Sequence, residues 1–306
     1  MSGANNSTKF YEEGSREWAI AFMSLALSGL ILNVLLIAYI FTRRLYKNYV
    51  SSHFIAHLAF TNLFSSCILI PLLAFNLWNG IRLLEPHDMW LLCNFRAFVT
   101  AVVWSVTNYM TLCVAGVHLL AFARIHYEQL FGVSPCLLCC LSWAVAAVLS
   151  LPCMTNSSIA DFDPKFLSCL WQFNADGLKF FTYFFILSYG IPAIFMVYAY
   201  LRILAILYHS PVVFRALGLY NSRWVVYAVM TSPLYFVPLF VAWALPELEP
   251  FYYQLAMFFA YFQSAVSPLV YGISLFLIKE EDMEIAARAQ TQKNAYTHPG
   301  LASHQL

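Results

Sequence analysis

The eight cysteines have the widest chemistry in this chain, because a thiol can form a disulfide, bind a metal or carry an acyl group. Cys93 and Cys169 fall in segments that we place outside the cell, where an oxidising compartment favours pairing over two free thiols. Their bond would tether the longest outer loop.

Cys136, Cys139 and Cys140 are spaced like metal ligands, but no histidine or acid lies near them in sequence. Small hydrophobic residues are therefore favoured there, and acylation stays open.

No catalytic combination can be assembled from the remaining reactive side chains. Serine and histidine occur, but no nucleophile, base and orienting acid come together, so we expect neither an enzyme nor a cofactor, metal or nucleic-acid partner. The polar residues within apolar segments are neutral: Asn33, Asn62, Thr107, Asn108, Thr111, His118, Ser264 and Ser267. They are expected mainly to form hydrogen bonds between helices. The lack of deep Asp, Glu or Lys argues against a proton pump or an ion-coupled transporter but leaves open a channel lined by hydroxyls or backbone.

Seven long apolar stretches must position these residues. The chain of 306 residues is 61% hydrophobic and 10% charged, whereas a soluble domain has about 25% charged residues. About 20 apolar residues cross a bilayer as a helix, and lipid forces the helical conformation. We therefore predict an all-α membrane protein, a seven-transmembrane helix bundle. The expected spans are 17–42, 52–78, 91–123, 134–153, 178–207, 221–245 and 251–277.

Charge and glycosylation sequons predict the same orientation. One face holds ten of the Lys and Arg residues: Arg43, Arg44, Lys47, Arg124, Arg202, Arg215, Arg223, Lys279, Arg288 and Lys293. The other face holds six, Arg96 among them, with ten acids. This bias places the first face in the cytoplasm. The sequons at Asn5, Asn6 and Asn156 all fall on the other face. We expect a multi-pass plasma-membrane protein with its N-terminus outside and its C-terminus in the cytoplasm.

Prolines interrupt most of these spans. They are Pro71, Pro152, Pro192, Pro233, Pro238 and Pro268. Each removes a backbone hydrogen bond and is expected to kink its helix. Bent helices leave a cavity between them and supply hinges, which a protein that moves needs and a simple anchor does not.

Several landmarks follow one another at regular places along the spans. They are Gly29 with Asn33, Leu58-Ala59-Phe60-Thr61-Asn62, Trp90 with Cys93, Trp143 with Pro152, Pro192 with Tyr200, Pro233, and Ser267-Pro268-Leu269-Val270-Tyr271. In this order the chain resembles the rhodopsin-like (class A) G-protein-coupled receptors, over about residues 18–285. The resemblance implies an outer tail at 1–17, a seven-transmembrane domain at 18–277, and a short helix 8 with a cytoplasmic tail at 278–306.

The positions that switch this family are altered in the chain. Val117-His118-Leu119 stands where the family has D-R-Y, and Asn62 replaces its sodium-binding Asp. Thr231 replaces the Trp before the proline of span six, and Ile125 replaces the Pro of the second inner loop. Helix 8 would run from Lys279 to Ala289 and opens with acids, which suits an anionic leaflet poorly. The other expected switch or coupling residues are Asn33, Tyr200, Pro233, Ser267, Pro268 and Tyr271.

The resemblance also implies a ligand pocket. Its residues would be Thr100, Trp104, Ser105, Phe184, Ser188, Leu234, Tyr235, Met257 and Tyr261. Thr100 replaces the acid that pairs with amine ligands, and Tyr261 replaces the lysine that holds retinal, so both ligand classes are disfavoured. This pocket is aromatic, hydroxylated and without charge, which favours a neutral or lipid-like ligand. The alternative is that these aromatic residues only pack the core and bind nothing.

The expected function is that of a receptor that passes an extracellular ligand signal to a heterotrimeric G protein or arrestin by helix rearrangement. One alternative is a non-signalling protein on the same scaffold, such as a scavenger, a decoy or a partner of another receptor. The altered D-R-Y position favours it. A channel or carrier is the weaker alternative, because deep ionisable groups are absent.

Overall fold

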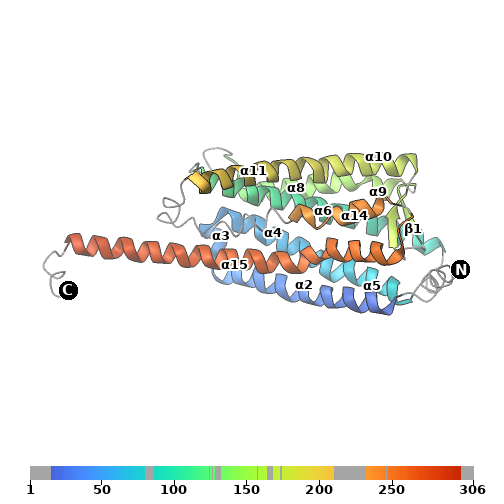
Figure 1. Ribbon diagram of the computed structural model, residues 1–306, viewed down its shortest axis with the longest axis horizontal. Coiled ribbons are helices and arrows are strands. Elements are labelled where there is room, and N and C mark those ends of the chain that lie inside the picture. Colours follow the sequence, from blue (N-terminus) through green and yellow to red (C-terminus); the bar gives the residue numbers. More distant parts are fainter. Residues whose placement is uncertain are drawn as a thin grey trace.

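The computed structural model describes residues 15–79, 86–123, 125, 127, 132–156, 158–163, 168–172, 174–209, 232–245 and 247–297. These residues form a bundle of helices and one short hairpin. The elements are α2 (Arg16–Thr42), α3 (Leu45–Asn48), α4 (Val50–Phe64), η1 (Ser65–Leu69), α5 (Ile70–Asn79), α6 (Pro86–Phe122), α8 (Pro135–Ser150), α9 (Pro152–Thr155), β1 (Ala160–Asp163), β2 (Ser168–Trp171), α10 (Ala175–Phe184), η3 (Phe185–Gly190), α11 (Ile191–His209), α14 (Val237–Trp243) and α15 (Pro250–Thr297). The helices run side by side along the long axis of the molecule (Figure 1).

Among the described residues, six helices are long and apolar enough to cross a membrane. They are Arg16–Thr42, Val50–Asn79, Leu92–Phe122, Pro135–Thr155, Ala175–His209 and Pro250–Glu284. They coincide with six of the predicted spans, so the all-α, membrane-type class is confirmed. The predicted span 221–245 is described only from residue 232 onward, where Ser232–Trp243 is apolar but shorter. The count of seven therefore stays a prediction.

The distribution of side chains across the bundle suits lipid. Leu35, Val148 and Ile194 expose 59%, 63% and 69% of their surface on the outside of the helices. In contrast, Asn33 and Ser105 are fully buried between helices. Wide apolar outer faces would be unfavourable in water, whereas in a bilayer they meet lipid tails while polar groups bond one another inside.

Prolines change the helices in different ways. The segments η1 and η3 are π-helical, and each ends two residues before a proline, Pro71 and Pro192 respectively. A proline donates no N–H, and its ring clashes with the carbonyl four residues earlier, so a wider turn there accommodates it. Pro152 instead starts α9 after a break from α8. Pro268 lies inside α15 without ending it.

The predicted helix 8 is not a separate element. The helix α15 continues without a break from Pro250 to Thr297, 48 residues, and extends past the other helices toward the C-terminal end (Figure 1). Its extension is anchored where the Tyr49 hydroxyl donates a hydrogen bond to the Asp282 carboxylate. Burial, and then this carboxylate, raise the pKa of Tyr49, so the phenol stays a donor. A run of good helix formers after Lys279 explains the continuity, because nothing there stops a helix.

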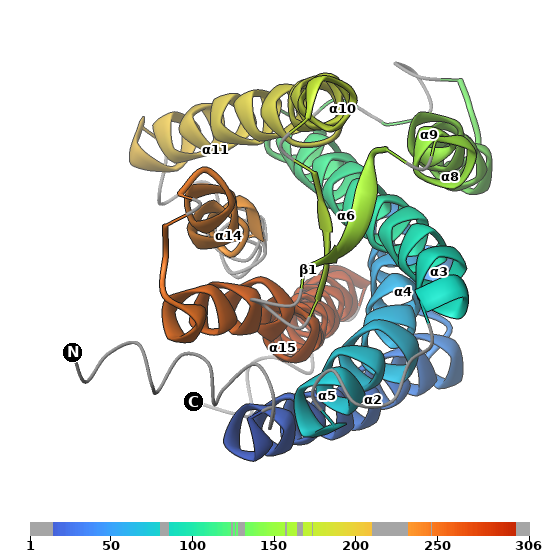
Figure 2. The same cartoon turned by 90° about the vertical axis from the view of Figure 1, so that its right-hand side faces the viewer.

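The two strands lie across one end of the bundle, which we call the hairpin end. They pair antiparallel, with Phe162 opposite Cys169 and Ala160 opposite Trp171. Seen along the bundle, the strands cross the space surrounded by α6, α10, α14 and α15 (Figure 2). The hairpin therefore covers the middle of the bundle at that end.

Candidate functional site

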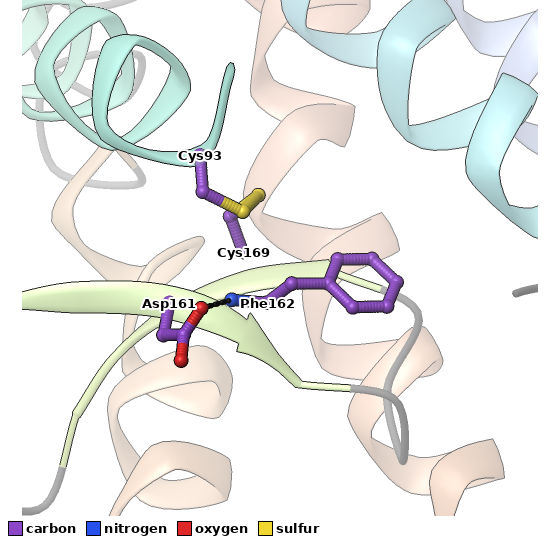
Figure 3. The surroundings of a disulfide bond; sticks show 4 residues. All are labelled: Cys93, Asp161, Phe162 and Cys169. Carbon is purple, nitrogen blue, oxygen red and sulfur yellow. Dashed lines mark hydrogen bonds between the residues drawn. A yellow bond between two sulfur atoms is a disulfide. The ribbon is translucent and has the colours of Figure 1, made fainter. Parts of the chain in front are cut away.

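The hairpin is held over the bundle by the predicted disulfide. Cys93, near the start of α6, is bonded to Cys169 of β2, with their Cα atoms 5.3 Å apart. Figure 3 shows this bond beside β1, where the Phe162 N–H donates to the Asp161 carboxylate at 2.7 Å. The bond joins positions 76 residues apart. It therefore brings the loop between α9 and α10 against the third span.

Below the hairpin lies a pocket between α6, α14 and α15. The centres of water molecules can occupy about 40 Å³ of it, and all of its empty space, open solvent included, is about 510 Å³. The smaller value is the one to compare with other cavities, and it corresponds to room for about three water molecules. Sites for drug-sized ligands span about 300–1,000 Å³. Such a ligand would therefore have to move side chains of the pocket wall.

Three indoles give the pocket its aromatic wall. Trp104 comes from α6, Trp171 from β2 and Trp243 from α14. The Trp104 and Trp171 rings meet edge to face at 5.9 Å between centroids. The Trp243 Nε1–H donates to the Trp171 carbonyl at 3.1 Å, and its ring stacks on Phe181 at 3.7 Å. The hairpin is thus locked to α10 and α14 through Trp171.

Three polar residues form one side of the same pocket. Arg96, Thr100 and Tyr261 all line it. The Tyr261 hydroxyl is within hydrogen-bonding reach of both other side chains. Arg96 is only 4% exposed. The expectation of an uncharged pocket is therefore wrong, because a buried guanidinium lies in its wall.

The structure brings four of the nine predicted ligand residues into this pocket. Thr100, Trp104, Met257 and Tyr261 line it. Leu234 is instead 63% exposed on the outside of the bundle. Its neighbour Tyr235 lies in a turn that separates Ser232–Leu234 from α14, and the inward place is taken by Phe236, which is 2% exposed. The turn shifts the register of this helix and so explains the difference.

The other three predicted ligand residues pack behind the pocket. Phe184 is buried against Trp171, with ring centroids 5.3 Å apart. The Ser105 hydroxyl donates to the Ser188 hydroxyl at 2.9 Å, and both residues are fully buried. This bond joins α6 to η3. These side chains support the pocket wall without lining it.

Deeper in the bundle, the expected switch residues form hydrogen bonds between helices. The Asn33 amide donates to the carbonyls of Gly29 and Ser264, each at 2.7 Å, and thereby joins α2 to α15. The Asn62 amide donates to the Ser267 hydroxyl at 2.8 Å and joins α4 to α15. Both bonds fit the expected role of neutral polar residues in helix interiors.

Further hydrogen bonds join neighbouring helices. Gln263 donates to the Ser232 hydroxyl at 2.6 Å. The Pro233 carbonyl accepts from the Tyr189 hydroxyl at 2.8 Å. Tyr271, three residues after Pro268, is 1% exposed. Thr231 lies outside the described residues.

The residues at the altered D-R-Y position are packed into the bundle. His118 is 6% exposed, and its Nε2 has no hydrogen-bond partner among the described residues. Val117 and Leu119 are half-buried and pack against a cluster of buried hydrophobic residues. Tyr200 packs on α6 next to Phe122. None of Val117, His118 and Leu119 therefore supplies the permanent charge that an arginine gives at the D-R-Y position.

The third sequon lies at the hairpin end of the bundle. The Asn156 Oδ1 accepts from the Ser158 N–H at 3.0 Å and from its hydroxyl at 2.7 Å. Asn5 and Asn6 lie outside the described residues, so glycosylation stays a prediction at all three positions.

Cys139 is buried, whereas Cys136 and Cys140 are exposed. Among the described residues, no three His, Cys, Asp or Glu side chains are grouped to bind a metal.

Sequence reasoning missed Arg96, Trp171 and Trp243. A signal for Arg96 was present, because Cys93, Arg96 and Thr100 are three and four residues apart and so share one helix face. The two tryptophans carry no such local signal, since tertiary packing of the hairpin and α14 brings them in.

No protein-family model and no curated protein matches the chain significantly.

Proposed function

We propose that this chain is a seven-helix plasma-membrane receptor of the rhodopsin-like type. It takes up an extracellular ligand at the hairpin end and transmits the signal by helix rearrangement to a heterotrimeric G protein or arrestin. The observation that carries the proposal is the pocket under a disulfide-tethered hairpin in a bundle of membrane-length helices. Pockets between the helices of a bundle are common ligand sites.

Contacts below the pocket support signal transmission. Trp104 in the pocket wall packs on Phe236 with ring centroids 5.3 Å apart. Phe236 follows Pro233, whose carbonyl is bonded to Tyr189 of η3. A ligand that moves Trp104 therefore acts on a proline-containing helix and on a π-helical turn. Such irregular turns are common at places where helices change shape.

One observation favours the non-signalling alternative. In the rhodopsin-like family that the chain resembles, an arginine that faces the G protein stands at the position of His118. Here His118 is buried, and its Nε2 has no hydrogen-bond partner among the described residues. A scavenger, a decoy or a partner of another receptor would need the pocket and not this contact.

Nucleotide exchange separates the two functions. The whole chain is reconstituted in lipid nanodiscs with one member of each G-protein class, and basal exchange is compared with that of empty nanodiscs. The receptor proposal expects at least one G protein to be accelerated by the unmodified chain. If only His118→Arg accelerates exchange, the scaffold can couple and the natural chain does not signal this way. His209→Arg, an exposed change at the end of α11, is the matched control.

A further inference from the structure

Arg96 is a buried cation with no counter-charge among the residues that the structure describes. It lies one helical turn after the disulfide-bonded Cys93 and is 4% exposed. Its Nη1 forms no hydrogen bond, and no described carboxylate forms an ion pair with it. Burying a charge is unfavourable unless it is paired and hydrogen-bonded. A wholly structural arginine would therefore be expected to have an acid beside it.

Arg96 is one of the residues that line the pocket, and its buried Nη1 has no partner there. The hydroxyls of Thr100 and Tyr261 line the pocket beside it, and both can donate to an acceptor. No acid is among the described residues that line this pocket. This corner of the pocket, as far as the structure describes it, is therefore rich in donors and without an anion.

The rest of the pocket is apolar. Trp104, Trp171 and Trp243 form its wall, and Leu239 and Met257 add aliphatic surface. The space of about 40 Å³ now open in the pocket is enough for a small head group, and an apolar body would have to move side chains of this wall. The donor-rich corner and the apolar wall thus match the two parts of an amphipathic molecule.

We propose that the pocket binds an amphipathic anion, whose carboxylate or phosphate head group pairs with Arg96 and whose apolar body lies against the tryptophans. The planar guanidinium offers two parallel N–H groups, a geometry that fits both kinds of oxyanion. The proposal deepens the function proposed above, since it names the ligand class of the same site. It replaces the neutral ligand expected from the sequence.

Quenching of tryptophan fluorescence tests the head group. The chain is placed in nanodiscs of zwitterionic phosphatidylcholine and titrated with ω-bromoundecanoate or with ω-bromoundecanol, which differ only in charge and oxygen count. Bromine quenches indoles that it touches. The carboxylate is expected to act at a concentration about tenfold or more below that of the alcohol, the effect of one hydrogen-bonded charge. Equal potency of the two probes would overturn the proposal.

Variants then assign this difference to Arg96. Arg96→Gln should remove the advantage of the carboxylate, and Arg96→Lys should keep part of it, since charge remains without the planar fork. Lys179→Gln removes an exposed cation of α10 and serves as the control, with the advantage unchanged. An advantage that persists in Arg96→Gln refutes the assignment.

Thermal unfolding gives a second measurement that does not depend on quenching. Without a probe, Arg96→Met should melt at a higher temperature than the natural chain, because it removes an uncompensated buried charge. Added ω-bromoundecanoate should raise the melting temperature of the natural chain and not that of Arg96→Met. A variant that melts lower, or fails to fold, shows a structural role for Arg96 and overturns the proposal.

Two arms of the unfolding experiment identify the source of the anion. If nanodiscs that contain phosphatidylglycerol stabilise the natural chain and not Arg96→Met, a bilayer lipid supplies the head group. If only ω-bromoundecanoate does so, the anion is a free amphiphile. Both results support the proposal. Neither arm contains a G protein, so a failure of anion binding is distinct from a failure of coupling.

Discussion

Gly177 shows how a single residue sets the geometry of the hairpin end. A Cβ on this residue would lie 2.0 Å from the Gln172 carbonyl oxygen, and that oxygen is part of the backbone and cannot turn away. The Gly177 N–H also donates to the Asn174 side chain, which caps α10. The absence of a side chain at this position therefore lets the hairpin approach the start of the helix.

The matched substitutions Gly177→Ala and Gly116→Ala should have effects of opposite sign. Gly177→Ala should destabilise the protein by about 1–3 kcal/mol, as overpacking does. Gly116 lies inside α6, and apart from the adjoining backbone of that helix no atom lies within 4 Å of its added Cβ, so Gly116→Ala should stabilise by about 0.4–1 kcal/mol through the unfolded chain. Thermal unfolding in nanodiscs measures both. Two shifts of the same sign would show that the close approach at Gly177 does not determine the effect of the substitution on stability.

The same scale shows which site residues the sequence could predict. Thr100, Trp104 and Tyr261 line the pocket because α6 and α15 are regular there, so spacing along the helix fixes the face; their binding of a ligand stays a prediction. Leu234 was misplaced because the turn at Tyr235 breaks that spacing. Arg96 lay on the predicted face but was counted as a surface charge. Composition identifies a charged side chain but does not show whether it is buried.

At the scale of elements, the hairpin depends on a cross-link. The Cys93–Cys169 bond closes a loop of 76 positions, and β2 carries Trp171 into the aromatic cluster. The double variant Cys93→Ala/Cys169→Ala should lose at most about 4.5 kcal/mol of stability, the entropic limit for a loop of that length. Residual structure in the inserted chain lowers this value.

Fluorescence and unfolding measure the consequence for the hairpin. Trp171 is 9% exposed, so its release toward water should shift the tryptophan emission of the double variant to longer wavelength. A reductant should do the same to the natural chain. Cys67→Ala, which removes an exposed free thiol, should change neither emission nor melting. An unchanged emission in the double variant would mean that side-chain packing alone holds the hairpin.

Elements differ in how far the sequence predicts them. Five of the six membrane-length helices lie within three residues of their predicted bounds, because length and hydropathy act locally and lipid admits little else. The sixth, predicted to end at residue 277, is apolar up to Glu284. The hairpin was not predicted, since its pairing is fixed by a distant cysteine and by packing on helices. The predicted helix 8 is not seen as a separate element for another reason: it came from the resemblance, whereas the chain from Lys279 to Thr297 has no proline or glycine to end a helix.

The two ends of the whole bundle carry different charges. The turn after α2 and the start of α3 hold Arg43, Arg44 and Lys47, and the hairpin end holds Asp161, Asp176, Glu247 and Glu249. Cytoplasmic loops are rich in Lys and Arg. Since α2 starts at the hairpin end and α15 finishes beyond the other end, the two chain termini are expected on opposite sides of the membrane (Figure 1).

Epitope tags at each end of the chain test this orientation. In intact cells an antibody should reach the N-terminal tag, and it should reach the C-terminal tag only after the membrane is permeabilised. Asn156→Gln should lower the apparent mass by one glycan, because the sequon lies at the hairpin end, which we expect to face outward. Ser157→Ala leaves the sequon intact and should keep that mass. If both tags were exposed on one side, the chain would cross the bilayer an even number of times, and a ligand pocket outside could not be joined to a cytoplasmic C-terminus.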